Sequence, residues 1–165
     1  MTGIVPREYW TYVVVPTLAR IGHPFDTASA GMLILGTALA ESGLKHLRQL
    51  GGGPARGPLQ IEPATAWDMV ERVIAAEPAL MHGVETFAAP FIDRDDFADQ
   101  LHWNLALGVV IARAKYWSDP HRLPGPDDFE GLANYWKRVY NTSAGTGRAS
   151  YFHHVLRAAT QGDVW

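Results

Sequence analysis

Glu41 is the residue with the strongest case for chemistry in this 165-residue chain. It follows a run of apolar and small residues, Ala30 to Ala40, and precedes Ser42-Gly43, so we expect it near the end of an apolar helix. Burial disfavours a charged carboxylate and raises its pKa, which suits the group to donate a proton. Cleavage of a glycosidic bond needs such a donor, because the leaving oxygen must take a proton in the transition state.

Three polar side chains farther along the chain are candidates for binding a sugar. Gln60 lies between two apolar residues and follows a Gly-Pro turn, and its amide can both donate and accept hydrogen bonds. Tyr140 and Asn141 precede the Ser143-Ala144-Gly145 turn, and an aromatic face beside an amide suits a sugar ring. The neighbouring Tyr135 and Trp136 are expected in the core.

A second catalytic carboxylate cannot be assigned from the sequence. The candidates are Glu62, Asp68 and Glu71, and a hydrolase would place one of them at a defined distance from the acid. Glu62 directly precedes Pro63, where a carboxylate favours the positive end of a helix dipole. No metal or cofactor is expected, because the chain has no cysteine and the adjacent His153 and His154 diverge on a helix.

The composition predicts one folded domain over residues 1–165, and we expect a monomer. Hydrophobic residues make up 47% of the chain and charged residues 19%, as in packed globular proteins. The net charge of −3 gives no electrostatic reason to bind nucleic acid. No apolar run approaches ~20 residues, so no membrane span is expected. The first ten residues do not have the pattern of a signal peptide.

The apolar periodicity is helical almost throughout, so the sequence predicts an all-α or α-dominated fold. The Gly51-Gly52-Gly53-Pro54 run predicts a loop over 43–58, with room for a short hairpin within 44–60. Residues 78–94 are expected to be irregular, with room for one short helical turn. The expected helices are 9–21 with an interruption at Pro16, 26–42 capped by Asp26-Thr27, 63–77, 95–117 capped by Asp95 or Asp96, 132–140 after an Asp127-x-x-Glu130 capping box, and 147–160.

Four short motifs in this order resemble the lysozyme-like superfamily, specifically the soluble lytic transglycosylases related to goose-type lysozyme. They span about residues 38 to 147, and the first two together are the more specific. The motifs are Glu41-Ser42, Gly57-Pro58-Leu59-Gln60-Ile61 with Pro63-Ala64-Thr65-Ala66, Asn104-Leu105-Ala106-Leu107-Gly108, and Tyr140-Asn141.

The resemblance implies a lysozyme-like fold that cleaves the β-1,4 bond between N-acetylmuramic acid and N-acetylglucosamine in peptidoglycan. Glu41 would be the catalytic acid and then the base, closing a 1,6-anhydro ring on the muramyl sugar. Ser42 and Gln60 would contact the glycan, and Tyr140 would hydrogen-bond near the catalytic carboxyl. Asn141, the last motif residue, is expected to bind substrate with them.

The chain departs from the family pattern at two places. Pro58 stands where the family has leucine, and Thr142-Ser143 follows Asn141 where Ala-Gly is usual. The departures leave three alternatives open, namely a muramidase that uses water, a non-catalytic glycan-binding or structural virion protein, and an unrelated helical adaptor. Small versions without a signal peptide resemble phage endolysins or virion-associated lysins. Such a protein is made in the host cytoplasm and acts on the periplasmic wall.

Overall fold

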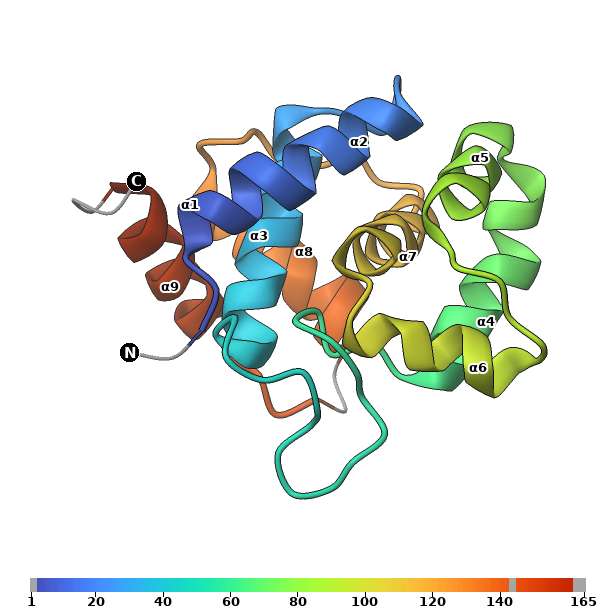
Figure 1. The fold of residues 1–165 in the computed structure, drawn as a ribbon. Helices are drawn as coiled ribbons and strands as arrows, with labels where there is room; N and C mark the ends of the chain where they lie inside the picture. Colours follow the sequence, from blue (N-terminus) through green and yellow to red (C-terminus); the bar gives the residue numbers. More distant parts are fainter. Residues whose placement is uncertain (1–2, 143–144, 162–165) are drawn as a thin grey trace.

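The computed structural model describes residues 3–142 and 145–161; helices are its main elements and loops connect them (Figure 1). The all-α prediction is therefore confirmed. Short π-helical turns cover Trp10–Val14 and Lys137–Asn141, and 3₁₀ turns cover Ile74–Ala76 and Gln100–His102. The α-helices are α1 (Pro6–Tyr9), α2 (Val15–Ile21), α3 (Ala28–Ser42), α4 (Pro63–Arg72), α5 (Pro78–Phe87), α6 (Arg94–Asp99), α7 (Leu105–Trp117), α8 (Phe129–Trp136) and α9 (Ala149–Gln161).

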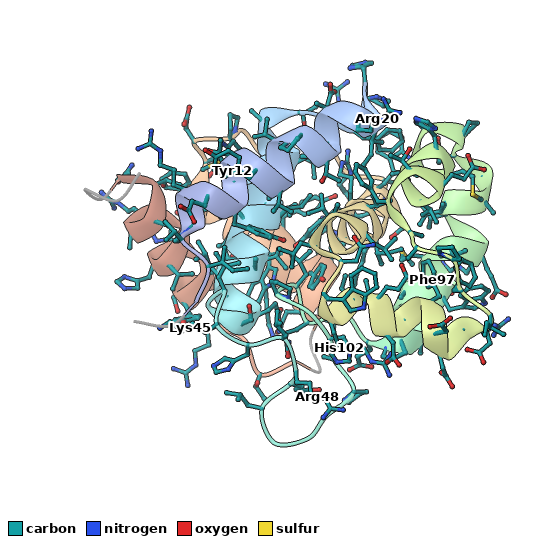
Figure 2. All side chains as sticks on the ribbon, viewed as in Figure 1. Tyr12, Arg20, Lys45, Arg48, Phe97 and His102 are labelled. Atoms are coloured by element: carbon teal, nitrogen blue, oxygen red, sulfur yellow. The ribbon has the colours of Figure 1, made fainter. Side chains whose placement is uncertain are left out.

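Two helices, α3 and α7, form the centre of the fold. Both are apolar on nearly every side, which is typical of helices that other elements surround. Helix α3 packs against α8 and α9, whereas α7 packs against α4 and α5 and also touches α3 (Figure 1). Phe97 on α6 completes the α4 side with an edge-to-face contact to Trp67, their ring centroids 5.7 Å apart (Figure 2). None of the described helices has both the length and the apolar character needed to cross a bilayer.

The ends of α3 follow the sequence closely. The Thr27 hydroxyl accepts a hydrogen bond from the Ala30 amide (3.2 Å), as expected of an N-cap. Gly43 ends the helix in the left-handed region, with φ of 61°. These caps confirm the predicted helix and leave Glu41 in its last turn.

The interruption at Pro16 is absorbed without ending the helical path. A proline inside a helix lacks the amide proton and clashes with the preceding turn. The chain widens into the π-helical turn Trp10–Val14 just before Pro16, and α2 continues from Val15. Proline then occupies the first turn of α2, where its missing donor costs little.

The prediction of an irregular segment over 78–94 was wrong for Pro78 to Phe87, which form the regular helix α5, whereas residues 88–93 are irregular. Pro78 occupies its first turn, where proline is tolerated. Gly83, in mid-helix, allows close packing, since a Cβ there would lie 3.2 Å from Ile21 and 3.3 Å from Val110. Pro78 therefore starts this helix and Gly83 serves its packing, so neither residue interrupts it.

The predicted helix over 95–117 is in fact two helices. The Asp93 carboxylate accepts hydrogen bonds from the amides of Asp95 and Asp96 and starts α6. Asn104 starts α7, because its Oδ1 accepts from the Leu107 amide (3.0 Å) while its Nδ2 donates to the Phe87 carbonyl (2.7 Å). Neither Asp95 nor Asp96 is the cap. The cap of α8 also differs by one residue, because Asp128, and not Asp127, accepts from the Gly131 amide, and the helix begins at Phe129.

The loop over 43–62 crosses the lower part of the molecule in Figure 1 and carries the exposed Arg48, which is labelled in Figure 2. It forms isolated antiparallel bridges from Arg56 to Arg48 and to Ile61, in place of a regular hairpin. An ion pair between Arg56 and Asp99 (2.7 Å) ties the loop to the end of α6.

Gly36→Ala is expected to destabilise the protein by about 1–3 kcal/mol, since overpacked cores cost this much. A Cβ at Gly36 would lie 2.2 Å from the buried Phe152 ring. Gly108→Ala is the matched control on α7, where the closest contact is an ordinary 3.6 Å to Leu59. Chemical denaturation of both variants measures the difference, and equal unfolding free energies would contradict the prediction.

Candidate active site

A groove of about 700 Å³ contains four of the residues singled out from the sequence. It lies between the end of α3, the 43–62 loop, the start of α4 and the π-helical turn Lys137–Asn141. Its walls include Glu41, Gln60, Tyr140 and Asn141. Segments that are far apart in the sequence therefore bring the candidate acid and three candidate sugar-binding residues together.

Glu41 is half-buried in the last turn of α3 and contacts α8 directly. The indole Nε1 of Trp136 donates a hydrogen bond to Glu41 Oε1 (3.2 Å). Trp136 is a core residue, 1% exposed and stacked on Phe152, so it holds this donor in a fixed place. The expectation that Trp136 belongs to the core is correct, but its polar edge also serves the site.

Burial raises the pKa of Glu41 above its ordinary value, and several neighbours partly oppose this. Hydrogen bonding with Asn141 and Trp136 lowers the pKa, as do the positive charges of Lys115 and Lys137. Burial thus favours the protonated acid, whereas the hydrogen bonds and the two positive charges favour the carboxylate, so the site has groups that stabilise each form.

Two lysines that were not predicted as site residues determine the electrostatic environment of Glu41. Burial lowers the pKa of Lys115, while the charges of Glu41 and Glu62 raise it. Lys115 Nζ lies 4.3 Å from the Tyr140 ring centroid and donates to the Tyr140 carbonyl (2.9 Å).

Lys137 Nζ donates to Asn141 Oδ1 (2.7 Å) and to two backbone carbonyls, and thereby orients the Asn141 amide. The available signal for Lys115 was a charged residue in a mainly apolar helix, a signal that it shares with Arg113.

Ser42 braces the loop and does not line the groove. Its side chain is buried, and its hydroxyl donates to the Pro58 carbonyl (2.7 Å), with the Ala38 carbonyl also within 3.0 Å. The same oxygen accepts from the Leu44 amide (3.1 Å). Its hydrogen-bonding capacity is used within the protein, so Ser42 supports the loop beside the groove, and the expected contact with the glycan stays a prediction.

Tyr140, in the π-helical turn Lys137–Asn141, also contacts the 43–62 loop. Its hydroxyl donates to the Leu59 carbonyl (2.8 Å), and its ring stacks on Tyr116 with centroids 5.3 Å apart. The hydroxyl therefore fixes the loop beside Glu41, and within the described residues it makes no hydrogen bond to the carboxyl group. The expected place near the acid is observed, but the hydrogen bond goes to the backbone.

Gln60 adopts the left-handed conformation, with φ of 48°, which is uncommon for a residue with a side chain. Its Nε2 donates to the Gly57 carbonyl (2.9 Å). Within the described part of the chain its Oε1 has no hydrogen-bond partner, so this oxygen can accept a hydrogen bond from a ligand in the groove. Backbone strain of this kind is often found at binding sites.

Of the three candidate second carboxylates, only Glu62 lines the groove. Asp68 pairs with Arg72 (3.4 Å) and Glu71 pairs with Arg94 (2.7 Å), both outside it. The described residues contain no group of three or more His, Asp or Glu side chains suited to a metal ion.

No family model matches the chain, and comparisons with curated proteins and with solved structures also return no match.

Trp136→Phe is expected to raise the pKa of Glu41 further, because it removes a donor that favours the charged form. The smaller ring also costs about 1–2 kcal/mol of stability. A ¹³C NMR titration of the side-chain carboxyl carbons measures the pKa. Trp103→Phe is the control, since Trp103 is 61% exposed. A Glu41 pKa that stays unchanged in Trp136→Phe would show that the indole does not act on the carboxyl.

Proposed function

We propose that this protein is a peptidoglycan lytic transglycosylase with Glu41 as its catalytic acid and base. The observation that carries the proposal is the convergence of Glu41, Gln60, Tyr140 and Asn141 on one groove. The raised pKa of Glu41 adds support, because an acid catalyst must hold its proton near the working pH.

In the proposed reaction Glu41 donates its proton to the glycosidic oxygen, and the bond from that oxygen to C1 of N-acetylmuramic acid breaks. The 6-hydroxyl of the same sugar then attacks C1. The Glu41 carboxylate takes the hydroxyl proton, so the acid is regenerated and no water is consumed. One carboxyl group is enough for both steps.

The surroundings of Glu41 suit both of its protonation states. Burial favours the protonated acid before bond cleavage. After the proton leaves, the Trp136 N–H and the charges of Lys115 and Lys137 stabilise the carboxylate until it accepts the next proton. Under the proposal, the Gln60 Oε1 orients sugar hydroxyl or acetamido groups, and Asn141 acts beside it through its hydrogen bond to the Glu41 carboxylate.

Digestion of purified peptidoglycan sacculi is expected to release muropeptides that end in 1,6-anhydro-N-acetylmuramic acid. Liquid chromatography with mass spectrometry distinguishes these from hydrolysis products, which are heavier by one water. Digestion in H₂¹⁸O is the control, because ring closure incorporates no solvent oxygen. Products that carry ¹⁸O at the new end would refute the transglycosylase.

A muramidase that hydrolyses the same bond is the second candidate, and the position of Glu62 favours it. Glu62 is the other carboxylate in the groove and interacts with Lys115, so it is available to activate water. Under this alternative Glu62→Gln would abolish cleavage, whereas a transglycosylase would retain most of its activity.

We further propose that the enzyme serves a phage as an endolysin or a virion-associated lysin, acting on the periplasmic wall. Permeabilised Gram-negative cells should then lose turbidity when the protein is added. Adhesion to the wall without clearing would instead indicate a glycan-binding or structural virion protein.

A further inference from the structure

A second cavity, of about 440 Å³, lies at the end of α3 opposite to Glu41. Ser29 lines this cavity and Glu41 lines the groove, and the two are about 18 Å apart along the helix at 1.5 Å per residue. The two cavities share no lining residue. The second one is therefore separate from the proposed catalytic groove.

Arg113 of α7 lines the second cavity and is only 2% exposed. Its Nε donates to the Phe25 carbonyl (2.9 Å), and its guanidinium carbon lies 5.3 Å from the ring centroids of both Phe25 and Trp117. These contacts hold the side chain in one orientation. Within the described part of the chain, its two terminal nitrogens have no hydrogen-bond partner and no carboxylate pairs with the group.

Such a charge is costly to bury without a counter-ion. Burial lowers the pKa of Arg113 to about 10, so the group is still charged at neutral pH. Asp119 is the acidic residue in the cavity wall, but Arg138 and His121 already hydrogen-bond to it. The Tyr135 hydroxyl also donates to Asp119 (3.2 Å). The carboxylate of Asp119 is thus engaged elsewhere.

The other walls indicate what kind of anion fits. Pro24, Trp117, Pro120 and Leu123 supply apolar surface around Arg113. Ser29, in the first turn of α3, adds a hydroxyl at the positive end of that helix. A planar carboxylate matches the two terminal guanidinium nitrogens, and an attached apolar group matches the walls.

We propose that this cavity binds an organic carboxylate with an aromatic or branched apolar body, held by Arg113. The proposal does not rest on the proposed catalytic function, since the two cavities are built from different residues.

Binding of N-acetyl-L-phenylalanine to the intact protein tests the proposal, with N-acetyl-L-phenylalaninamide and inorganic phosphate as comparison ligands. In a ¹H–¹⁵N NMR titration, the carboxylate should shift the Arg113 Nε–Hε signal and the Ser29 amide. It should bind at least ten-fold tighter than the amide, because only the carboxylate can form charge-assisted hydrogen bonds with the guanidinium. Phosphate should bind at least ten-fold more weakly than the carboxylate, since it makes no contact with the apolar walls.

Arg113→Gln should lower the affinity for the carboxylate at least ten-fold, to the level of the amide. Arg20→Gln is the matched control, because Arg20 is exposed at the outer end of α2 (Figure 2). If Arg113→Gln does not fold, the comparison of carboxylate with amide in the wild-type protein still decides. Equal affinity for the two ligands, shifts confined to the Glu41 groove, or no binding of the carboxylate would overturn the proposal. Phosphate binding as tight as that of the carboxylate would overturn the apolar part of it.

Discussion

Glu41→Gln is expected to lower the rate of glycan cleavage by about 10²–10⁴-fold, the usual contribution of a general acid–base group. Glutamine has nearly the same shape as glutamate, and its amide oxygen can still accept from the Trp136 indole. It cannot donate a proton of suitable acidity to the leaving oxygen. Release of muropeptides from sacculi, measured over time, gives the rate.

Glu85→Gln is the matched control, because Glu85 is exposed on α5, outside the groove. It should leave the rate unchanged. If Glu41→Gln keeps more than a tenth of the wild-type rate, Glu41 is not the catalytic acid.

Melting temperatures of Glu41→Gln distinguish a loss of catalysis from a loss of folding. The folded pKa of Glu41 is raised, so its protonated form stabilises the native state below the unfolded pKa. This contribution is lost as the pH rises through the folded pKa. Glu41→Gln carries no such charge, so it should melt at a higher temperature than the wild type at pH 7, with the gap closing toward pH 4. A variant that melts lower at both pH values would mean a structural role.

Gly57→Ala is expected to have the second largest effect, lowering both stability and activity. Gly57 has φ of 71°, and a Cβ there would lie 2.2 Å from the backbone carbonyl oxygen of Leu101. The conformational strain and the clash together cost about 2–4 kcal/mol. To relieve the clash the loop must move away from the 3₁₀ turn Gln100–His102, and the move would carry Gln60 with it.

Gly52→Ala is a close control for this substitution. Gly52 has a similar φ of 83°, but nothing lies within 4 Å of its Cβ position. It therefore incurs the conformational cost alone, about 1 kcal/mol. Thermal melts and cleavage rates of both variants test the prediction. Equal losses of stability and of activity in the two variants would show that the contact with Leu101 is unimportant.

The sequence predicted those parts of the fold that depend on local patterns. Helix α3 was recognised from its apolar run and from Thr27, whose hydroxyl caps it. The sequence did not predict α5, because Gly83 is needed there for close packing against Ile21 and Val110, which lie on other helices. A cap such as Asn104, which also binds the Phe87 carbonyl, is likewise defined by tertiary structure.

The candidate site likewise contains residues that the sequence predicts and residues that only the tertiary structure reveals. Glu41 and Gln60 stand in short motifs whose residue types already indicate chemistry, and both line the groove. Trp136 and Lys115 act on Glu41 from sequence distances that no local pattern records. Ser42 follows Glu41 directly, yet it faces the loop, because successive residues on a helix point in different directions.

The loop beside the acid is held at two consecutive carbonyl groups, those of Pro58 and Leu59, by the hydroxyls of Ser42 and Tyr140. Every amino acid, proline included, has a backbone carbonyl, so this attachment does not depend on which side chain stands at position 58. The departure of Pro58 from the lytic transglycosylase pattern is therefore compatible with an unchanged path of the loop. Replacing Ser42 or Tyr140 instead would remove one of the two hydroxyls and release the loop at that carbonyl.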